Sequence, residues 1–182
     1  MNMNKTTRGV SNTLLLIVFL ITIISCQNSV KESNLTKSQS IGPKKGALLI
    51  GGGGITDEMY KVFFDLAGGK SAKLVVIPTA FSENDINYDP EFKILERKFR
   101  AIGFEDIQFM HTRDISIANS DAFVKPLRSA TAVWLTGGRQ WRTADAYLNT
   151  RTHTELFNVL NRGGIIGGHS AGVISSQGRK GY

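Results

Sequence analysis

One short segment near the end of the chain combines a serine with closely spaced glycines. Residues 163–173 read GGIIGGHSAGV, and residues 168–172 match the pattern G-x-S-x-G. In that pattern the serine follows a strand and precedes a helix, on a turn so tight that glycine is needed beside it. The pattern predicts nucleophilic acyl chemistry at Ser170, presented at the N-terminus of a helix. A glycine-rich strand end with an incidental serine is the alternative on these five residues alone.

Three further segments precede the serine in a regular order. Residues 132–140 read AVWLTGGRQ, an apolar run that ends in two glycines and a glutamine, and residues 48–53 and 74–80 read LLIGGG and LVVIPTA. Together, over residues 46–178, the four segments resemble the cyanophycinase and aspartyl-dipeptidase family of serine peptidases. That family carries a strand ending in Gly-Gly-x-Gln and, after an intervening helix, a Gly-x-Ser-Ala-Gly elbow. The resemblance is closer to cyanophycinase than to the dipeptidases.

The resemblance implies a role for four residues. Ser170 is the nucleophile, the backbone N–H groups of Ala171 and Gly138 form the oxyanion hole, and Gln140 contacts the substrate. The implied substrate is a peptide with aspartyl or isoaspartyl bonds. For Gln140 the alternative is a polar residue that satisfies backbone donors at the start of a helix.

Three positions depart from the family pattern. His169 stands where the family usually has Thr, Val173 where it often has Ala, and Arg139 where cyanophycinases often have Asp. A larger departure concerns the general base, because the catalytic His of this family and its acidic partner follow the nucleophile. Residues 171–182 contain no His, Asp or Glu. We therefore interpret the chain as the N-terminal portion of a peptidase and expect it, as written, to have little or no activity.

The three histidines of the chain are weak candidates for the base. His169 adjoins the serine, and neighbours in a tight turn point in different directions. His111 follows a predicted strand on the ligand side and is better placed, although a solvated loop residue is the alternative. His153 is predicted to be a cap or surface residue at a helix start. The sequence leaves the base unassigned.

Two other functions remain open from the sequence. The first is a catalytically dead protein that keeps the cleft for binding; a reading frame that continues past Tyr182 with a His and a carboxylate would argue against it. The second is an α/β-hydrolase esterase, which G-x-S-x-G alone would allow. The sequence disfavours the esterase because no His-Gly-Gly oxyanion motif precedes the elbow.

The pattern from residue 46 onward alternates strands with helices. The predicted strands are residues 47–50, which are expected to be buried, 74–77, 107–110, 133–135 and one that begins at 165. The predicted helices are residues 56–67, with Thr56 as the cap, 88–102, 121–127, 141–148 and 154–161. Such alternation predicts an α/β fold, a parallel sheet with helices on both faces, and ligands bind beyond the carboxyl ends of its strands. The fold is expected to be flavodoxin-like, as in class I glutamine amidotransferases, and incomplete at its C-terminus within residues 46–182.

The first 45 residues have the composition of an export signal and a tether. Residues 1–26 combine a basic start, an apolar centre and a lipobox-like end at Cys26, which predicts a lipoprotein signal peptide with a lipid on that cysteine. An ordinary signal peptide or signal anchor with an incidental cysteine is the alternative. Residues 27–45 are polar and are predicted to be a flexible tether. The expected location is the bacterial cell envelope, membrane-anchored, in the periplasm or on the outer surface.

Composition argues against several classes of protein. The net charge is +7, but the basic residues are scattered and are not interleaved with aromatics, so we do not predict nucleic-acid binding. The glycine run 51–54 lacks the third glycine and the acidic residue of a dinucleotide fold. One cysteine and unpaired histidines argue against a metal site. The sequence predicts no cofactor.

Overall fold

The computed structural model describes residues 42–88 and 90–170. The predicted leader, residues 1–26, and most of the predicted tether lie outside these residues, as does the oxyanion candidate Ala171. Within the described residues, no helix has the length and apolar character needed to cross a bilayer.

Within the residues that the structure describes, the sheet has five parallel strands in the order β1-β5-β4-β2-β3. The strands are β1 (Ala47–Gly51), β2 (Lys73–Ile77), β3 (Asp106–Phe109), β4 (Ala132–Leu135) and β5 (Ile165–His169). If β2, β3, β4 and β5 are numbered one to four, they lie in the order 2-1-3-4 that is found in flavodoxin-like sheets. Strand β1 lies beyond β5, in the place of the fifth strand. The predicted α/β class is confirmed.

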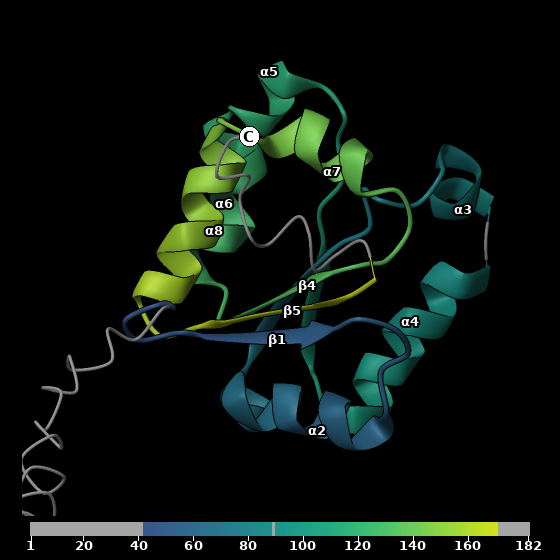
Figure 1. Cartoon of the computed structure of the whole chain (residues 1–182), viewed down its shortest axis with the longest axis vertical. Helices are drawn as coiled ribbons and strands as arrows, with labels where there is room; N and C mark the ends of the chain where they lie inside the picture. Colours follow the sequence, from purple (N-terminus) through teal and green to yellow (C-terminus); the bar gives the residue numbers. More distant parts are fainter. Residues whose placement is uncertain (1–41, 89, 171–182) are drawn as a thin grey trace, which may run out of the picture. The chain divides into compact units, whose positions relative to one another are not determined.

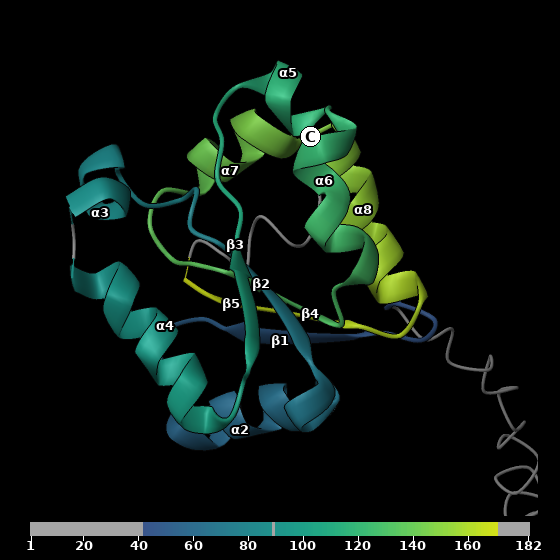
Figure 2. The same ribbon diagram turned by 180° about the vertical axis from the view of Figure 1, so that it is seen from behind.

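Helices cover both faces of the sheet (Figure 1). The structure describes α2 (Asp57–Leu66), α3 (Glu83–Tyr88), α4 (Pro90–Ile102), α5 (Ile115–Ala118), α6 (Asp121–Ser129), α7 (Gln140–Tyr147), α8 (Arg151–Asn161) and a 3-10 turn at Gly69–Ser71. Seen from either side, α2 and α4 lie on one face, and α6 and α8 lie on the other (Figures 1 and 2). The core is accordingly divided into two layers, one on each face of the sheet.

The layer beneath α2 and α4 is aromatic. Phe63 and Phe99 are fully buried and pack on the indole of Trp134, which projects from β4 with ring centroids 5.0 and 5.6 Å away. On the neighbouring strand, a Cβ at Gly167 would lie 2.7 Å from ring atoms of both Phe63 and Trp134. Glycine at this position of β5 is thus required by the rings that cover the strand, because a side chain would displace them.

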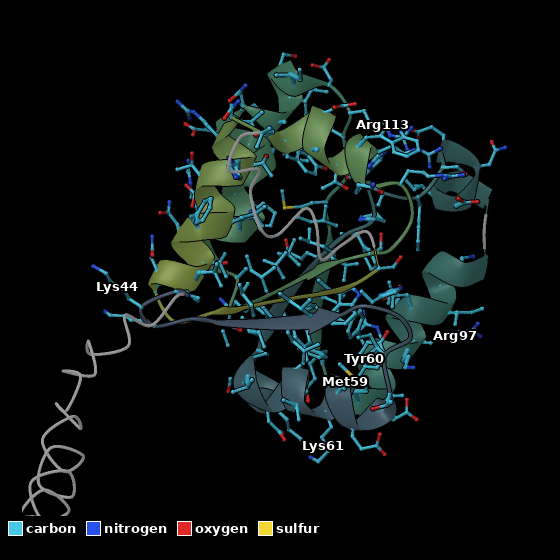
Figure 3. The ribbon with its side chains drawn as sticks, in the orientation of Figure 1. Lys44, Met59, Tyr60, Lys61, Arg97 and Arg113 are labelled. Carbon is cyan, nitrogen blue, oxygen red and sulfur yellow. The ribbon has the colours of Figure 1, made fainter. Side chains whose placement is uncertain are left out.

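The start of α2 follows from its sequence. The Thr56 hydroxyl accepts a hydrogen bond from the Met59 backbone N–H at 3.3 Å, so it caps the helix as predicted. In Figure 3, Tyr60 points from this helix toward the sheet while Lys61 points away from it. Tyr60 is 5% exposed and the Lys61 side chain is 73% exposed, which is the division expected of an amphipathic helix.

The structure corrects the predicted elements in three places. The strand β1 is expected to be buried, but Leu48 and Ile50 are 37% and 41% exposed, because within the described residues β1 is an edge strand and pairs with β5 alone. The helix α8 begins at Arg151 rather than at residue 154, because the Thr150 hydroxyl caps it. The short helices α3 and α5 were not predicted. They are six and four residues long, and α5 depends on a local cap from Asp114 rather than on an apolar periodicity.

Candidate active site

Ser170 follows β5 directly and has an unusual backbone conformation. Its φ is +51°, in the left-handed region that few residues other than glycine adopt. The Ser170 N–H donates a hydrogen bond of 2.8 Å to the carbonyl of Gly51, which ends the neighbouring strand β1. The residue is exposed at the carboxyl end of the sheet, between β1 and β4. A residue with a strained backbone that is hydrogen-bonded to a neighbouring strand at the carboxyl end of a sheet is typical of a functional position.

The turn after β4 lies against Ser170. A Cβ placed at Gly137 would be 3.5 Å from the Ser170 Cβ and 3.1 Å from the His169 Nε2. Gly138 has a φ of +127°, and a Cβ there would lie 2.3 Å from the Ala80 carbonyl oxygen. These two glycines let the β4 turn fit between the segment after β2 and the segment after β5.

Hydrogen bonds hold this turn in place on its other side. The Arg139 N–H donates to the Ala80 carbonyl at 2.8 Å, and the Arg142 guanidinium donates to the same oxygen at 3.2 Å. Gln140 is the first residue of α7, and its side chain is half-buried. The N-cap residue of α7 is Arg139, and its side chain makes no capping hydrogen bond.

The described histidines do not contact the Ser170 hydroxyl. The ring of His169 is half-buried and lies against Trp134 at a centroid distance of 6.0 Å. Burial lowers the pKa of His169, which favours the neutral ring. His153 is the third residue of α8, and its ring packs edge-on against Phe157, 5.1 Å away. Within the described residues, neither ring makes a hydrogen bond to the serine hydroxyl.

His111 lies two residues beyond the end of β3 and is half-buried rather than solvated. Its Nδ1 is 3.0 Å from the Thr79 hydroxyl, and its Nε2 is 3.5 Å from a carboxylate oxygen of Glu83. Burial lowers the pKa of His111, and the Glu83 carboxylate opposes this shift. In the sheet, β4 and β2 separate β3 from β5, so His111 does not adjoin Ser170.

Three buried polar atoms on the α2 side have no hydrogen-bond partner within the described part of the chain. They are the Trp134 indole nitrogen, the Thr136 hydroxyl and the His169 Nδ1. All three belong to the last residues of β4 and β5 or directly follow them. Sequence reasoning did not anticipate this group, because the residues become neighbours only through the pairing of β4 with β5.

A separate groove lies at the opposite end of the strands, where they begin. It is lined by residues 66–68, 128–131 and 162–164, which surround the amino ends of β4 and β5. Ligands of parallel α/β sheets bind at the carboxyl ends. This groove shares no residue with the neighbourhood of Ser170 and gives no support to a catalytic role.

The fold and the position of the serine define a parallel α/β protein with a strained Ser at the carboxyl end of a central strand. Residues 47–178 match the family model of peptidase family S51. The chain therefore belongs to peptidase family S51, a family of serine-type peptidases.

Individual relatives agree with this assignment. The chain is 27% identical over 117 residues to a cyanophycinase of Geminocystis herdmanii, an alignment that covers 64% of this chain and 42% of the relative. Among solved structures it resembles a peptidase from an acI-B1 Actinobacterium (TM-score 0.56, 20% identity, 70% of this chain and 55% of that one). It also resembles a putative peptidase E protein of Listeria monocytogenes (TM-score 0.50, 16% identity, 70% and 59%). The chain thus spans about half the length of the relatives it matches.

Proposed function

We propose that this protein hydrolyses aspartyl or isoaspartyl peptide bonds in the manner of a cyanophycinase, with Ser170 as the nucleophile. The observation that carries the proposal is the left-handed backbone of Ser170 at the end of β5, with a φ of +51°. A serine on such a turn projects its hydroxyl clear of the sheet, where an acyl carbon can approach it. The hydrogen bond of its N–H to Gly51 at 2.8 Å supports a fixed backbone position for the serine, and Gly137 leaves no room beside it for a larger side chain.

The surrounding residues suit the remaining roles of acyl transfer. A tetrahedral intermediate needs two donors aimed at its oxyanion, and the proposed donors are the backbone N–H groups of Ala171 and Gly138. Gly138 belongs to the turn that lies against Ser170. Gln140, at the N-terminus of α7 a short way along the same turn, is the proposed contact for the substrate.

The general base is the open part of this mechanism. A serine hydroxyl is a weak nucleophile until a neighbouring base takes its proton. Within the described residues, no histidine makes a hydrogen bond to the Ser170 hydroxyl, and a catalytically inactive binding protein is the second candidate. Membership of a peptidase family argues against the third possibility, an α/β-hydrolase esterase.

A comparison of two proteins tests the proposed activity. The product of the whole reading frame and a chain that ends at Tyr182 are incubated with cyanophycin and with matched aspartyl, isoaspartyl and asparaginyl peptides. We expect the chain that ends at Tyr182 to hydrolyse these peptides only at a residual rate, roughly a thousandfold above water, because residues 171–182 supply no His or carboxylate. Rapid turnover by this shorter chain would mean that His111 or His169 can serve as the base.

We further propose that the protein is a lipoprotein of the cell envelope. The support is the order of basic, apolar and lipobox-like residues that ends at Cys26. In cells fed a labelled fatty acid, the wild-type protein is expected to become labelled and to sediment with membranes, whereas Cys26→Ser is expected to remain unlabelled. A wild-type protein that takes up no more label than Cys26→Ser would contradict the lipid anchor.

A further inference from the structure

A chain of hydrogen bonds runs from the core to the carboxyl end of β3. The Tyr147 hydroxyl is buried, accepts a hydrogen bond from the Thr112 N–H at 3.2 Å and lies 2.6 Å from the Thr79 hydroxyl. Thr79 is fully buried, and its hydroxyl lies 3.0 Å from the His111 Nδ1. These hydrogen bonds therefore link α7, the segment after β2 and the segment after β3.

The direction of the hydrogen bonds follows from the number of donors. If His111 donated to Thr79, and Thr79 to Tyr147, the phenol proton of Tyr147 would be buried without a partner. The opposite direction uses every proton, because Tyr147 donates to Thr79 and Thr79 donates to the His111 Nδ1. The neutral imidazole then carries its proton on Nε2, the nitrogen that faces Glu83.

Arg113 provides a second donor beside the neutral His111, and this donor is cationic. Its Nη1 lies 3.0 Å from the Glu83 Oε1, and its Nη2 donates to the Phe81 carbonyl at 2.5 Å. Figure 3 shows Arg113 between α7 and α3. The imidazole Nε2 lies 3.5 Å from the same carboxylate oxygen. Two donors, one of them held by buried residues, thus converge on one carboxylate.

The carboxylate that occupies this position is weakly held. Glu83 begins the six-residue helix α3, and its side chain is 52% exposed, whereas the side chains of His111 and Arg113 are 21% and 33% exposed. An exposed ion pair on a short helix contributes little stability. His111 and Arg113 are therefore the more firmly held partners in this contact, and the Glu83 carboxylate is the partner that another carboxylate can replace.

We propose that His111 and Arg113 form a carboxylate-binding subsite of the substrate cleft, and that an acidic side chain of the substrate displaces Glu83 from it. The inference rests on the proposed peptidase function and adds where a second acidic residue is recognised. The subsite lies beyond the ends of β2 and β3, which are two and three strand spacings from β5, or roughly 10–14 Å. An extended peptide covers that span with about three to four residues. The subsite therefore binds an acidic residue distant from the cleaved bond, not the residue at the bond itself.

Removal of the competing carboxylate gives the sharpest test. The affinities of acetyl-tetraaspartate amide and acetyl-tetraasparagine amide are measured by calorimetry on the full chain carrying Ser170→Ala, which prevents turnover. Glu83→Gln is expected to bind the tetraaspartate at least fivefold more tightly, because the acidic peptide no longer competes with Glu83, and to leave tetraasparagine binding unchanged. If Glu83 were only a structural partner, its loss would leave the affinity unchanged or lower it.

Glu96→Gln is the matched control. Glu96 also pairs with an arginine, Arg100, at 2.7 Å on the exposed side of α4, so its removal alters the net charge equally. We expect Glu96→Gln to alter tetraaspartate binding less than twofold. If Glu83→Gln and Glu96→Gln raised the affinity for tetraaspartate equally, the change in net charge alone would explain the effect. That result would overturn the subsite.

Loss of the cationic donor gives the reciprocal result. Arg113→Gln is expected to weaken tetraaspartate binding about tenfold, the effect of one charge-assisted hydrogen bond, while Arg100→Gln changes it less than twofold. Equal effects of the two variants, or no binding of tetraaspartate to any of the proteins, would overturn the proposal. Because these measurements need no catalysis, they are independent of hydrolysis: the subsite stands if binding follows this pattern in a protein that cleaves nothing.

Discussion

Ser170→Ala is expected to lower the kcat/KM of aspartyl peptide hydrolysis by about five to six orders of magnitude in the product of the whole reading frame. The alanine keeps the substrate contacts and the oxyanion donors but removes the atom that forms the acyl intermediate. The residual rate should then be that supplied by binding and by the oxyanion hole alone. The two proteins are compared by the rate of peptide cleavage under identical conditions.

Ser129→Ala is the matched control for this experiment. Ser129 is an exposed serine at the end of α6. It lies near the amino ends of the strands, away from the proposed cleft at their carboxyl ends. We expect this variant to retain wild-type kinetics. A Ser170→Ala protein that keeps more than a tenth of the wild-type kcat/KM would remove Ser170 from the mechanism.

Gly138→Ala is expected to have the largest effect on stability. The residue has a φ of +127°, and the new Cβ would lie 2.3 Å from the carbonyl oxygen of Ala80. That oxygen accepts hydrogen bonds from Arg139 and Arg142, so it cannot move without the loss of both. Backbone strain costs about 1–3 kcal/mol, and the clash adds a similar amount. The loss should lower the Tm by roughly 10 °C in a domain of this size.

Gly163→Ala separates the clash from the strain. Gly163 has a φ of +100°, but no atom lies within 4 Å of the Cβ position. This variant should lose only the cost of the left-handed backbone, about 1–2 kcal/mol. Thermal unfolding of the two variants is compared with that of the wild type. Equal losses at the two glycines would show that the β4 turn yields to the added methyl group.

The parts of the fold that sequence predicts best are those set by local chemistry. Apolar runs such as residues 74–77 and 132–135 identify the central strands, because strands buried on both faces need apolar side chains throughout. The Thr56 cap likewise follows from adjacent residues alone. The place of Ser170 directly after a strand also follows from its glycine pattern.

Features that depend on pairing between distant segments are not predictable in this way. The exposure of Leu48 and Ile50 follows from the edge position of β1, which only the strand order reveals. The cluster around His111 joins residues 32 to 68 positions apart in sequence. The sequence places His111 at the ligand side of the sheet, but it carries no signal that Thr79 and Tyr147 orient the ring.

The most direct test of the central claim is covalent labelling of the nucleophile. The product of the whole reading frame is treated with a fluorophosphonate, which reacts with activated serines, and the modified peptide is identified by mass spectrometry. The account predicts one adduct, on Ser170, that forms in step with the loss of peptidase activity and is absent from Ser170→Ala. An adduct on another residue that accompanies the loss of activity, or full loss of activity with Ser170 unmodified, would contradict it.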